Sequence, residues 1–191
     1  AASERLNEGG VFVQWLPLYQ LTEFEFGVIT RTMLEAFEQV TLWRNNFAPG
    51  SEKVALIGQK KRLSLPIPPD THRAEMRDAV EGFSWQEAMP EMVRPEPEAI
   101  PFFYAGNVSA EKALFESYPI NTDDMPVIEY QTPRRFRELA ATEKVVWFVG
   151  PKLVTMIEKI LRQCPVTTDP MLEGHPDSSR RLVIAGAAFH Q

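Results

Sequence analysis

Residues 8–16 read Glu-Gly-Gly-Val-Phe-Val-Gln-Trp-Leu, two glycines followed at once by an apolar run. Glycine just past a helix tolerates the left-handed conformation in which the chain reverses, so residues 1–10 are predicted to be the last turns of a helix. The β-branched and aromatic residues at 11–16 predict a strand directly after it. The chain is therefore expected to begin inside an α/β domain, with earlier units of that domain ahead of residue 1.

A helix is predicted to begin after this strand, at Thr22. Thr22 and Glu25 have the spacing of a capping box, in which each side chain satisfies a backbone amide of the first turn. The segment that follows carries one apolar stripe at three- to four-residue spacing, made of Phe26, Ile29, Met33, Phe37 and Val40. Leu21 and Phe26 are placed as a hydrophobic staple. The helix is expected to pack this stripe against a sheet.

Two further strands are predicted at 40–43 and 54–58, where the sequence is β-branched and apolar. The turn-forming residues between them favour an antiparallel pair. The first connection is expected to be a right-handed crossover if the strands at 11–16 and 40–43 are parallel. The predicted fold class is α/β, a truncated sheet of about three strands followed by a mostly helical C-terminal region.

Changes in amino-acid composition along the sequence divide the chain into three regions. Residues 1–64 are the α/β portion, and the proline-rich run at 65–69 marks its end, because proline lacks an amide donor. Residues 65–133 are predicted to be a connector with short helices and an extended segment. Residues 134–191 are predicted to be a helical tail.

Within the later regions, helices are predicted at 70–82, 98–105 and 109–118. Residues 119–130 are expected to form a polar turn, with local bonds from Asn121 and Thr122, followed by an extended apolar piece. Residues 145–149 have the composition of a strand, yet their helix-favouring flanks assign them to a helix. A last helix is predicted to begin at Asp177 or Ser178 and to run through Phe189.

Composition excludes several classes of function. Twenty basic and twenty-six acidic residues give a net charge of −6, the wrong sign for nucleic acid and a fit for a small, cationic ligand. Cys164 is the only cysteine, so neither an internal disulfide nor a thiolate metal cluster is predicted, and a packed thiol is expected. The three histidines are far apart and lack partners at ligand spacing, so no metal site is predicted. No apolar run is long enough to cross a bilayer.

Residues 8–15, the capped helix and the segment 40–58 resemble the C-terminal units of the catalytic domain of spermidine synthases. These enzymes are aminopropyltransferases with a fold like that of class I methyltransferases, so the resemblance implies a Rossmann-like sheet whose final strands run 5-7-6 with the last antiparallel. Residues 119–130, Pro-Ile-Asn-Thr-Asp-Asp-Met-Pro-Val-Ile-Glu-Tyr, resemble a motif of larger bacterial spermidine-synthase-like proteins. Many of those proteins carry transmembrane helices, so the resemblance implies a cytoplasmic domain and allows a parent protein attached to the inner membrane.

The resemblance also implies a reaction. The parent protein would transfer an aminopropyl group from decarboxylated S-adenosylmethionine to a polyamine. The family binds that co-substrate through motifs that would precede residue 1, so no catalytic and no cofactor-binding residue is predicted in this chain. The chain by itself is expected to be inactive.

Two residues are candidates for substrate binding. Gln14, at the carboxyl end of the first strand, corresponds under the resemblance to a glutamine of the polyamine pocket, and its carbonyl would accept a bond from an ammonium group. The alternative is a polar strand residue satisfied by backbone. Phe47 falls near a loop whose tyrosine faces the amine in true spermidine synthases, and the alternative is a phenylalanine that only packs.

Two alternatives to the transferase stay open: a non-catalytic scaffold with an interacting helical tail, and a small-molecule methyltransferase-like domain. The strand at 11–16 is expected to lack a neighbour on one side, which exposes unpaired amides and carbonyls. We therefore expect either a homo-oligomer formed through this edge or a helical tail that folds over the uncovered surface.

Overall fold

The chain is a mixed α/β protein in the computed structural model, which describes residues 2–45, 50–61, 97–141 and 146–188. The strands are β1 (Val11–Pro17), β2 (Gln39–Arg44), β3 (Lys53–Gln59) and β4 (Tyr104–Asn107). The α-helices are α1 (Ala2–Arg5), α2 (Glu23–Ala36), α5 (Val127–Ala141), α6 (Pro151–Gln163) and α7 (Asp177–Ala188). Short 3₁₀ segments are η1 (Leu18–Gln20), η2 (Pro97–Phe103), η3 (Val108–Phe115) and η4 (Pro170–Leu172).

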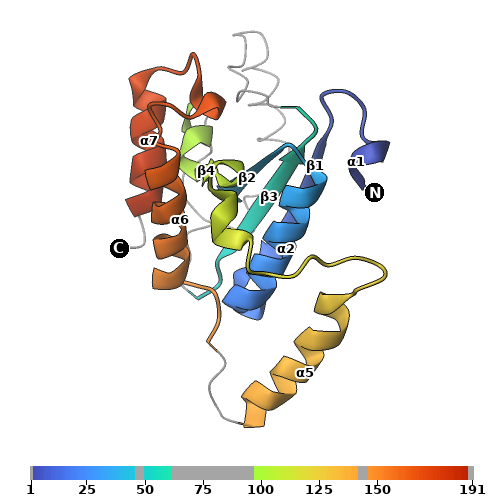
Figure 1. The fold of residues 1–191 in the computed structure, drawn as a ribbon. Coiled ribbons are helices and arrows are strands. Elements are labelled where there is room, and N and C mark those ends of the chain that lie inside the picture. The colour runs from blue at the N-terminus through green and yellow to red at the C-terminus, as the bar shows by residue number, and fades with distance from the viewer. Residues whose placement is uncertain (1, 46–49, 62–96, 142–145, 189–191) are drawn as a thin grey trace, which may run out of the picture.

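The four strands form one open sheet in the order β1-β3-β2-β4, and every neighbouring pair is antiparallel (Figure 1). Ile57 of β3 lies between Val13 of β1 and Thr41 of β2. Because β3 is antiparallel to both neighbours, β1 and β2 are parallel to each other, with α2 as their connection. The three predicted strands thus lie side by side, and the predicted antiparallel pair of β2 and β3 is confirmed.

Helix α2 packs on one face of this sheet, as its apolar stripe predicted. The capping box is present, with Thr22 N donating to Glu25 Oε2 at 2.9 Å. Phe37 ends the helix and lies over Gly58 of β3, where an added Cβ would come within 2.5 Å of its ring. The Phe37 ring also stacks on Phe12 of β1 at a centroid distance of 5.6 Å. The missing side chain at Gly58 is therefore what lets the end of α2 approach the sheet.

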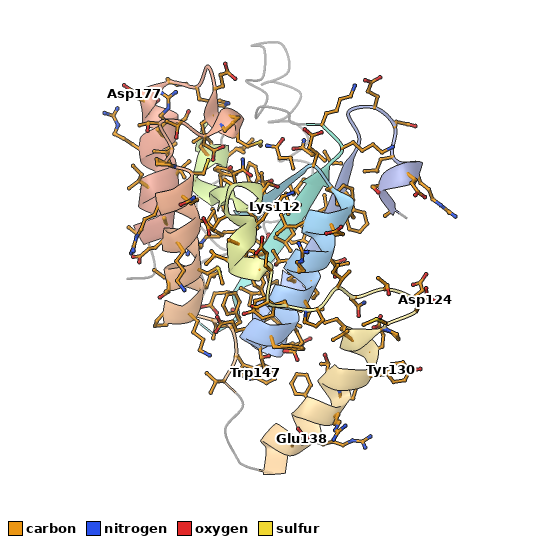
Figure 2. The ribbon with its side chains drawn as sticks, in the orientation of Figure 1. Lys112, Asp124, Tyr130, Glu138, Trp147 and Asp177 are labelled. Carbon is orange, nitrogen blue, oxygen red and sulfur yellow. The ribbon has the colours of Figure 1, made fainter. Side chains whose placement is uncertain are left out.

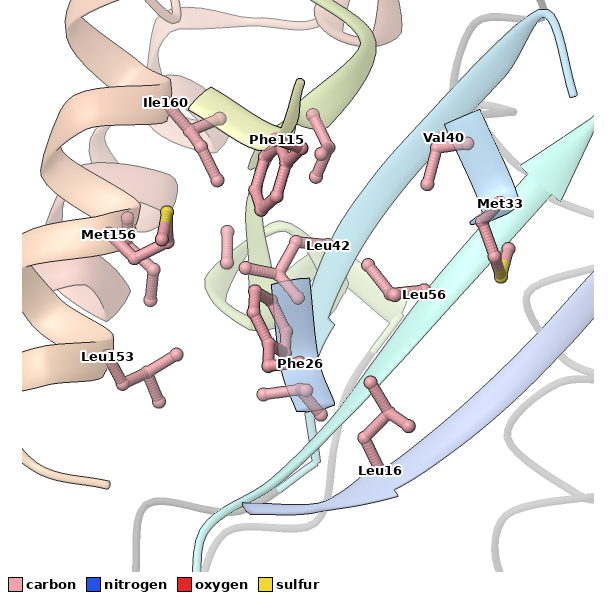
Figure 3. Packing of buried hydrophobic residues seen from close by; sticks show 14 of the residues in the cluster. Leu16, Phe26, Met33, Val40, Leu42, Leu56, Phe115, Leu153, Met156 and Ile160 are labelled. Carbon is pink, nitrogen blue, oxygen red and sulfur yellow. The ribbon is translucent and has the colours of Figure 1, made fainter. Parts of the chain in front are cut away.

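The main hydrophobic core joins the first and the last parts of the chain (Figure 3). Leu16, Leu42 and Leu56 come from the sheet, and Ile157 comes from α6. The rings of Phe26 and Phe148 stack at 4.5 Å. Burial of such side chains is the dominant favourable term in folding, so α6 is part of the body of the protein.

The β4 side of the sheet is covered by the last two helices. Gly106 of β4 has φ +121°, and a Cβ there would meet Ile160 of α6 at 2.7 Å. A second core cluster holds Tyr104 of β4 together with Met171, Leu172 and Val183. The opposite edge differs, because β1 pairs only with β3 in the part of the chain that the structure describes. Val11, Val13 and Trp15 of β1 are 48%, 40% and 56% exposed.

The prediction for residues 98–105 is correct only in part. A 3₁₀ segment, η2, ends at Phe103, and β4 follows from Tyr104 as a fourth strand that the sequence did not reveal. Its pairing with β2 is supported by Ser109, whose Oγ accepts from Val40 N at 2.6 Å. The predicted helix at 109–118 is shorter, a 3₁₀ segment that ends at Phe115.

Two other predictions are wrong. Residues 127–130 are helical and not extended, because Asn121 Oδ1 accepts from Ile128 N at 2.9 Å and satisfies the first turn of α5. Residues 146–149 are not helical, because Phe148 N donates to Leu21 O at 2.8 Å. Helix α6 begins only after Gly150, with Pro151 at its first position. The helix predicted at 70–82 lies outside the described residues.

The C-terminal region is mostly helical, as predicted, and α7 begins at Asp177. Among the described helices, none combines the length and the apolar character that crossing a bilayer demands.

Candidate functional site

A pocket of about 280 Å³ opens at the end of the sheet where β1 and β2 finish. Its described lining consists of Trp15, Leu16, Pro17, Asn45 and Lys53. In open α/β sheets, ligands bind beyond the carboxyl ends of parallel strands, and the parallel strands β1 and β2 both end at this pocket. The pocket is therefore the candidate site of this chain.

The lining residues come from three strand ends that hydrogen bonds hold together. Pro17 of β1 lies opposite Lys53 of β3, and Asn45 N donates to Lys53 O at 3.0 Å just after β2. Trp15 presents an exposed indole, whereas Leu16 is buried and forms part of the core. The pocket thus combines an apolar and aromatic wall with one amide and one ammonium group among its described residues.

Gln14 does not appear among the described residues that line this pocket. It lies opposite Leu56, on the other face of β1 from Trp15, and its Nε2 donates to Trp15 O at 3.2 Å. This bond fits the alternative of a strand residue satisfied by backbone, while a role in binding an amine stays a prediction. Phe47 lies outside the described residues.

Two charged side chains are buried at the loop end of the β2–β3 hairpin, next in sequence to two of the residues that line the pocket. Glu52 is 1% exposed, and its Oε1 accepts from Gly150 N, at the start of α6, at 3.0 Å. Arg44 donates to Gly186 O in the last turn of α7. Burial lowers the pKa of Arg44 to about 10, and the negative charge of Glu52 opposes this shift. The residues next to this pair, Asn45 and Lys53, line the pocket.

A second buried polar group joins Asp169, in the α6–α7 connection, to Tyr104 of β4. Asp169 Oδ2 accepts from Tyr104 Oη at 2.7 Å, and its Oδ1 accepts from Met171 N at 3.0 Å. Burial raises the pKa of Asp169, and burial beside Asp169 raises the pKa of Tyr104 well above its ordinary value. Burial also raises the pKa of Cys164 to about 11, and this side chain is buried, as the expectation of a packed thiol requires.

The Asn-Thr-Asp-Asp patch is a helix-capping turn. Asn121 N donates to Thr32 Oγ1 of α2 at 2.8 Å, and Thr122 and Met125 exchange backbone bonds. The local side-chain-to-backbone bonds predicted for Thr122 and Asn121 are also present, because Met125 N donates to Thr122 Oγ1 at 3.0 Å and Ile128 N donates to Asn121 Oδ1 at 2.9 Å. Asp124 lies at the outer end of the turn, and Tyr130 and Glu138 lie along α5 (Figure 2). Within the described residues, no three potential ligands gather to hold a metal ion.

Sequence reasoning missed Lys53, Arg44, Glu52 and Asp169. Arg44 and Glu52 lie at the two ends of the loop between two predicted strands. Oppositely charged residues in these positions could have indicated that the two side chains interact. Asp169 precedes Pro170, a pattern that indicates a helix start. Nothing in the sequence indicated that Arg44, Glu52 and Asp169 would be buried.

Comparisons of the chain with protein-family models, with curated proteins and with solved structures found no match. The functional assignment therefore depends on the geometry described above and on the sequence motifs.

Proposed function

We propose that this chain is the C-terminal part of a spermidine synthase-like protein and forms the amine-side wall of its pocket. The parent protein would transfer an aminopropyl group from decarboxylated S-adenosylmethionine to an amine by direct displacement. The nucleophile is a neutral amine nitrogen, which attacks the methylene carbon of the aminopropyl group. The carbon–sulfur bond of the sulfonium breaks, methylthioadenosine leaves, and the product amine releases a proton.

The observation that carries this proposal is the strand order β1-β3-β2. The aminopropyltransferase fold ends with strands in the order 5-7-6, the last one antiparallel, and β1, β3 and β2 fit those places in order and direction. Helix α2 then takes the place of the connection between strands 5 and 6. A Rossmann-like sheet is therefore the finer description that we propose for the mixed α/β fold.

The two sides of the sheet support the same interpretation. Helices α6 and α7 pack against β4, so residues of the same chain cover that side of the sheet. The outer edge of β1 has no strand partner in the described residues, and three apolar side chains beside it are exposed. A nucleotide-binding half that supplies one more strand would pair with this edge and cover it.

The alternative of a scaffold with a separate interacting tail receives less support. Phe148 and Ile157 of the tail belong to the same core cluster as Phe26 and Leu16. A tail that shares the core of the sheet is a structural part of the domain. For the parent protein we propose a cytoplasmic catalytic domain, with attachment to the inner membrane through other segments.

The test combines the chain with a nucleotide-binding half, either encoded ahead of Ala1 or supplied as a fusion from a spermidine synthase. Mass spectrometry after incubation with decarboxylated S-adenosylmethionine and an amine is expected to detect the aminopropylated amine and methylthioadenosine. Incubation with S-adenosylmethionine separates the methyltransferase alternative, which predicts a methylated product. A folded fusion that binds neither nucleotide would contradict the proposal.

A further inference from the structure

We propose that Trp15, and not Gln14, is the residue of β1 that contacts the substrate, and that its indole holds the non-reacting ammonium group of a diamine. The choice of an amine depends on the proposed function, whereas the choice of Trp15 depends on the structure. A substrate-positioning role is thereby assigned to a side chain for which no binding role was predicted from the sequence.

The alternation of side chains along β1 decides between these two neighbours. Successive residues of a strand point to opposite faces of a sheet. Trp15 lines the pocket, whereas Gln14 does not appear among the described lining residues and donates to Trp15 O at 3.2 Å. Pro17 shares the face of Trp15 and lies opposite Lys53, and both residues also line the pocket. Trp15, Pro17 and Lys53 thus form a wall on one face of the sheet, and the buried Leu16 belongs to the core.

The indole of Trp15 is accessible to a ligand. Trp15 is 56% exposed, and Ala55, which lies opposite it on β3, has only a methyl side chain. Aromatic side chains contribute large areas to cores and interfaces, so an exposed indole in the wall of a pocket indicates a contact surface. The pocket has a volume of about 280 Å³, which suits a small molecule.

An ammonium group is well matched to this surface. The face of an indole carries negative charge density, and tryptophan attracts a cation more strongly than the other aromatic residues do. The whole chain has a net charge of −6, which favours the approach of a cation.

The proposed reaction determines which nitrogen of the diamine the ring holds. The attacking nitrogen must be neutral, so it cannot be the group that a cation–π contact retains. The ammonium group over Trp15 is therefore the one at the far end of the acceptor. Holding that end orients the neutral nitrogen toward the aminopropyl donor, which makes Trp15 a positioning residue.

The experiment compares butylamine with 1-butanol, two probes of equal length in which an ammonium group is replaced by a hydroxyl. Binding to the full chain at pH 7, where the amine is protonated, is followed by NMR through the side-chain amide of Asn45, which lines the pocket. We expect butylamine to bind about threefold more tightly than 1-butanol, as a cation–π contact at a partly exposed site provides.

Substitutions of Trp15 separate the ring from the apolar wall. Trp15→Leu keeps an apolar side chain and is expected to abolish the preference for the amine, whereas Trp15→Phe keeps an aromatic face and should retain it in part. Trp15→Thr, a second residue that strands accept, replaces the leucine variant if that protein does not fold. Tyr130→Leu removes a ring that is 75% exposed on α5, away from the pocket, and should retain the full preference (Figure 2). Lys53 is unchanged in every protein compared.

Equal binding of the two probes by the wild type would overturn the inference. A preference that survives in Trp15→Leu or Trp15→Thr would also overturn it, and so would the failure of both probes to shift the Asn45 signals in the millimolar range.

The proposed function is judged separately, by aminopropyl transfer in the completed protein. There, Trp15→Leu is expected to raise KM for the diamine about threefold and to leave KM for decarboxylated S-adenosylmethionine unchanged. Transfer with an unchanged KM for the diamine would leave the transferase in place and remove the role of Trp15. A ring-dependent preference for the amine without any transfer would leave the ammonium contact and remove the transferase.

Discussion

Arg44 and Glu52 interact at the loop end of the β2–β3 hairpin, and each one meets the end of a different helix. The carboxylate of Glu52 accepts from Gly150 N at the amino end of α6, and the guanidinium of Arg44 donates to Gly186 O near the carboxyl end of α7. Both signs match the helix dipole, which favours an anion at the first end and a cation at the second. Two buried side chains of opposite charge therefore attach the two C-terminal helices to the sheet, each through its own hydrogen bond.

Replacing Glu52 by alanine is expected to lower the free energy of unfolding by about 3 kcal/mol, because Gly150 N loses its acceptor and the buried Arg44 loses a nearby opposite charge. Glu52→Gln should cost less, since an amide oxygen still accepts from Gly150 N. Urea denaturation measures both. Glu138→Gln, which breaks the exposed pair with Arg134, is the control and should change stability by less than about 1 kcal/mol. Equal effects at the two positions would contradict the attachment role of Glu52.

Gly58→Ala is expected to destabilise the protein by about 1–3 kcal/mol, because the new methyl group would lie within 2.5 Å of the Phe37 ring. The smaller side chain in Phe37→Leu should relieve the clash, so the double variant should lose less stability than the two single variants together. Thermal unfolding of all four proteins closes this cycle. Strict additivity would show that Phe37 does not lie over Gly58.

The open edge of β1 predicts self-association of the chain when no further strand covers it. Residues 11–16 contain no charged side chain and no proline, and the β1–β3 register runs without a bulge, so only Pro17 at its end protects β1 as an edge strand. Antiparallel pairing about Val13 would bring Val11 of one copy opposite Trp15 of the other. Sedimentation should detect a dimer that Val13→Lys disrupts and that Ile184→Lys, at an exposed position of α7, leaves intact. A compact monomer with fast hydrogen exchange along β1 would argue against it.

The buried Asp169 predicts a specific dependence of stability on pH. Burial raises its pKa in the folded state, so the native protein binds a proton more tightly at this site than the unfolded chain does. Its contribution to stability is therefore fully present below the ordinary aspartate pKa and is lost as the pH rises through the raised value. Asp169→Asn removes this component. Urea denaturation near pH 4 and pH 7 should show the difference between wild type and variant shifting in favour of wild type at the lower pH, and a constant difference would refute the prediction.

Local signals in the sequence were sufficient for the first sixty residues. The capping box at Thr22, the spacing of the apolar stripe and the turn formers after residue 44 each specify structure through neighbours in the chain, so β1, α2, β2 and β3 were predictable. The sequence also placed a ligand at the carboxyl end of the first strand, where the pocket opens, but it did so through Gln14, which does not appear among the described lining residues. Lys53, however, lies one residue before the strand predicted at 54–58, and no role was predicted for it.

The parts that could not be predicted depend on distant contacts. Tyr104 begins a strand only because β2 offers a free edge for pairing, and that edge comes from sixty residues earlier. Phe148 is not helical because its backbone amide donates to Leu21 O and its ring stacks on Phe26. The helix at Val127 depends on Asn121, whose capping bond spans a turn of six residues. Local composition contains none of these partners.

The placement of α6 and α7 against β4 has a consequence for what happens at high concentration. Strand addition extends into filaments only when both flanks of a sheet accept a new neighbour. Here all four residues of β4 are buried and α6 packs on Gly106, so assembly through β1 alone is expected to end after a single pairing and to close as a symmetric pair. A chain with an unprotected strand is thereby kept from growing into fibres.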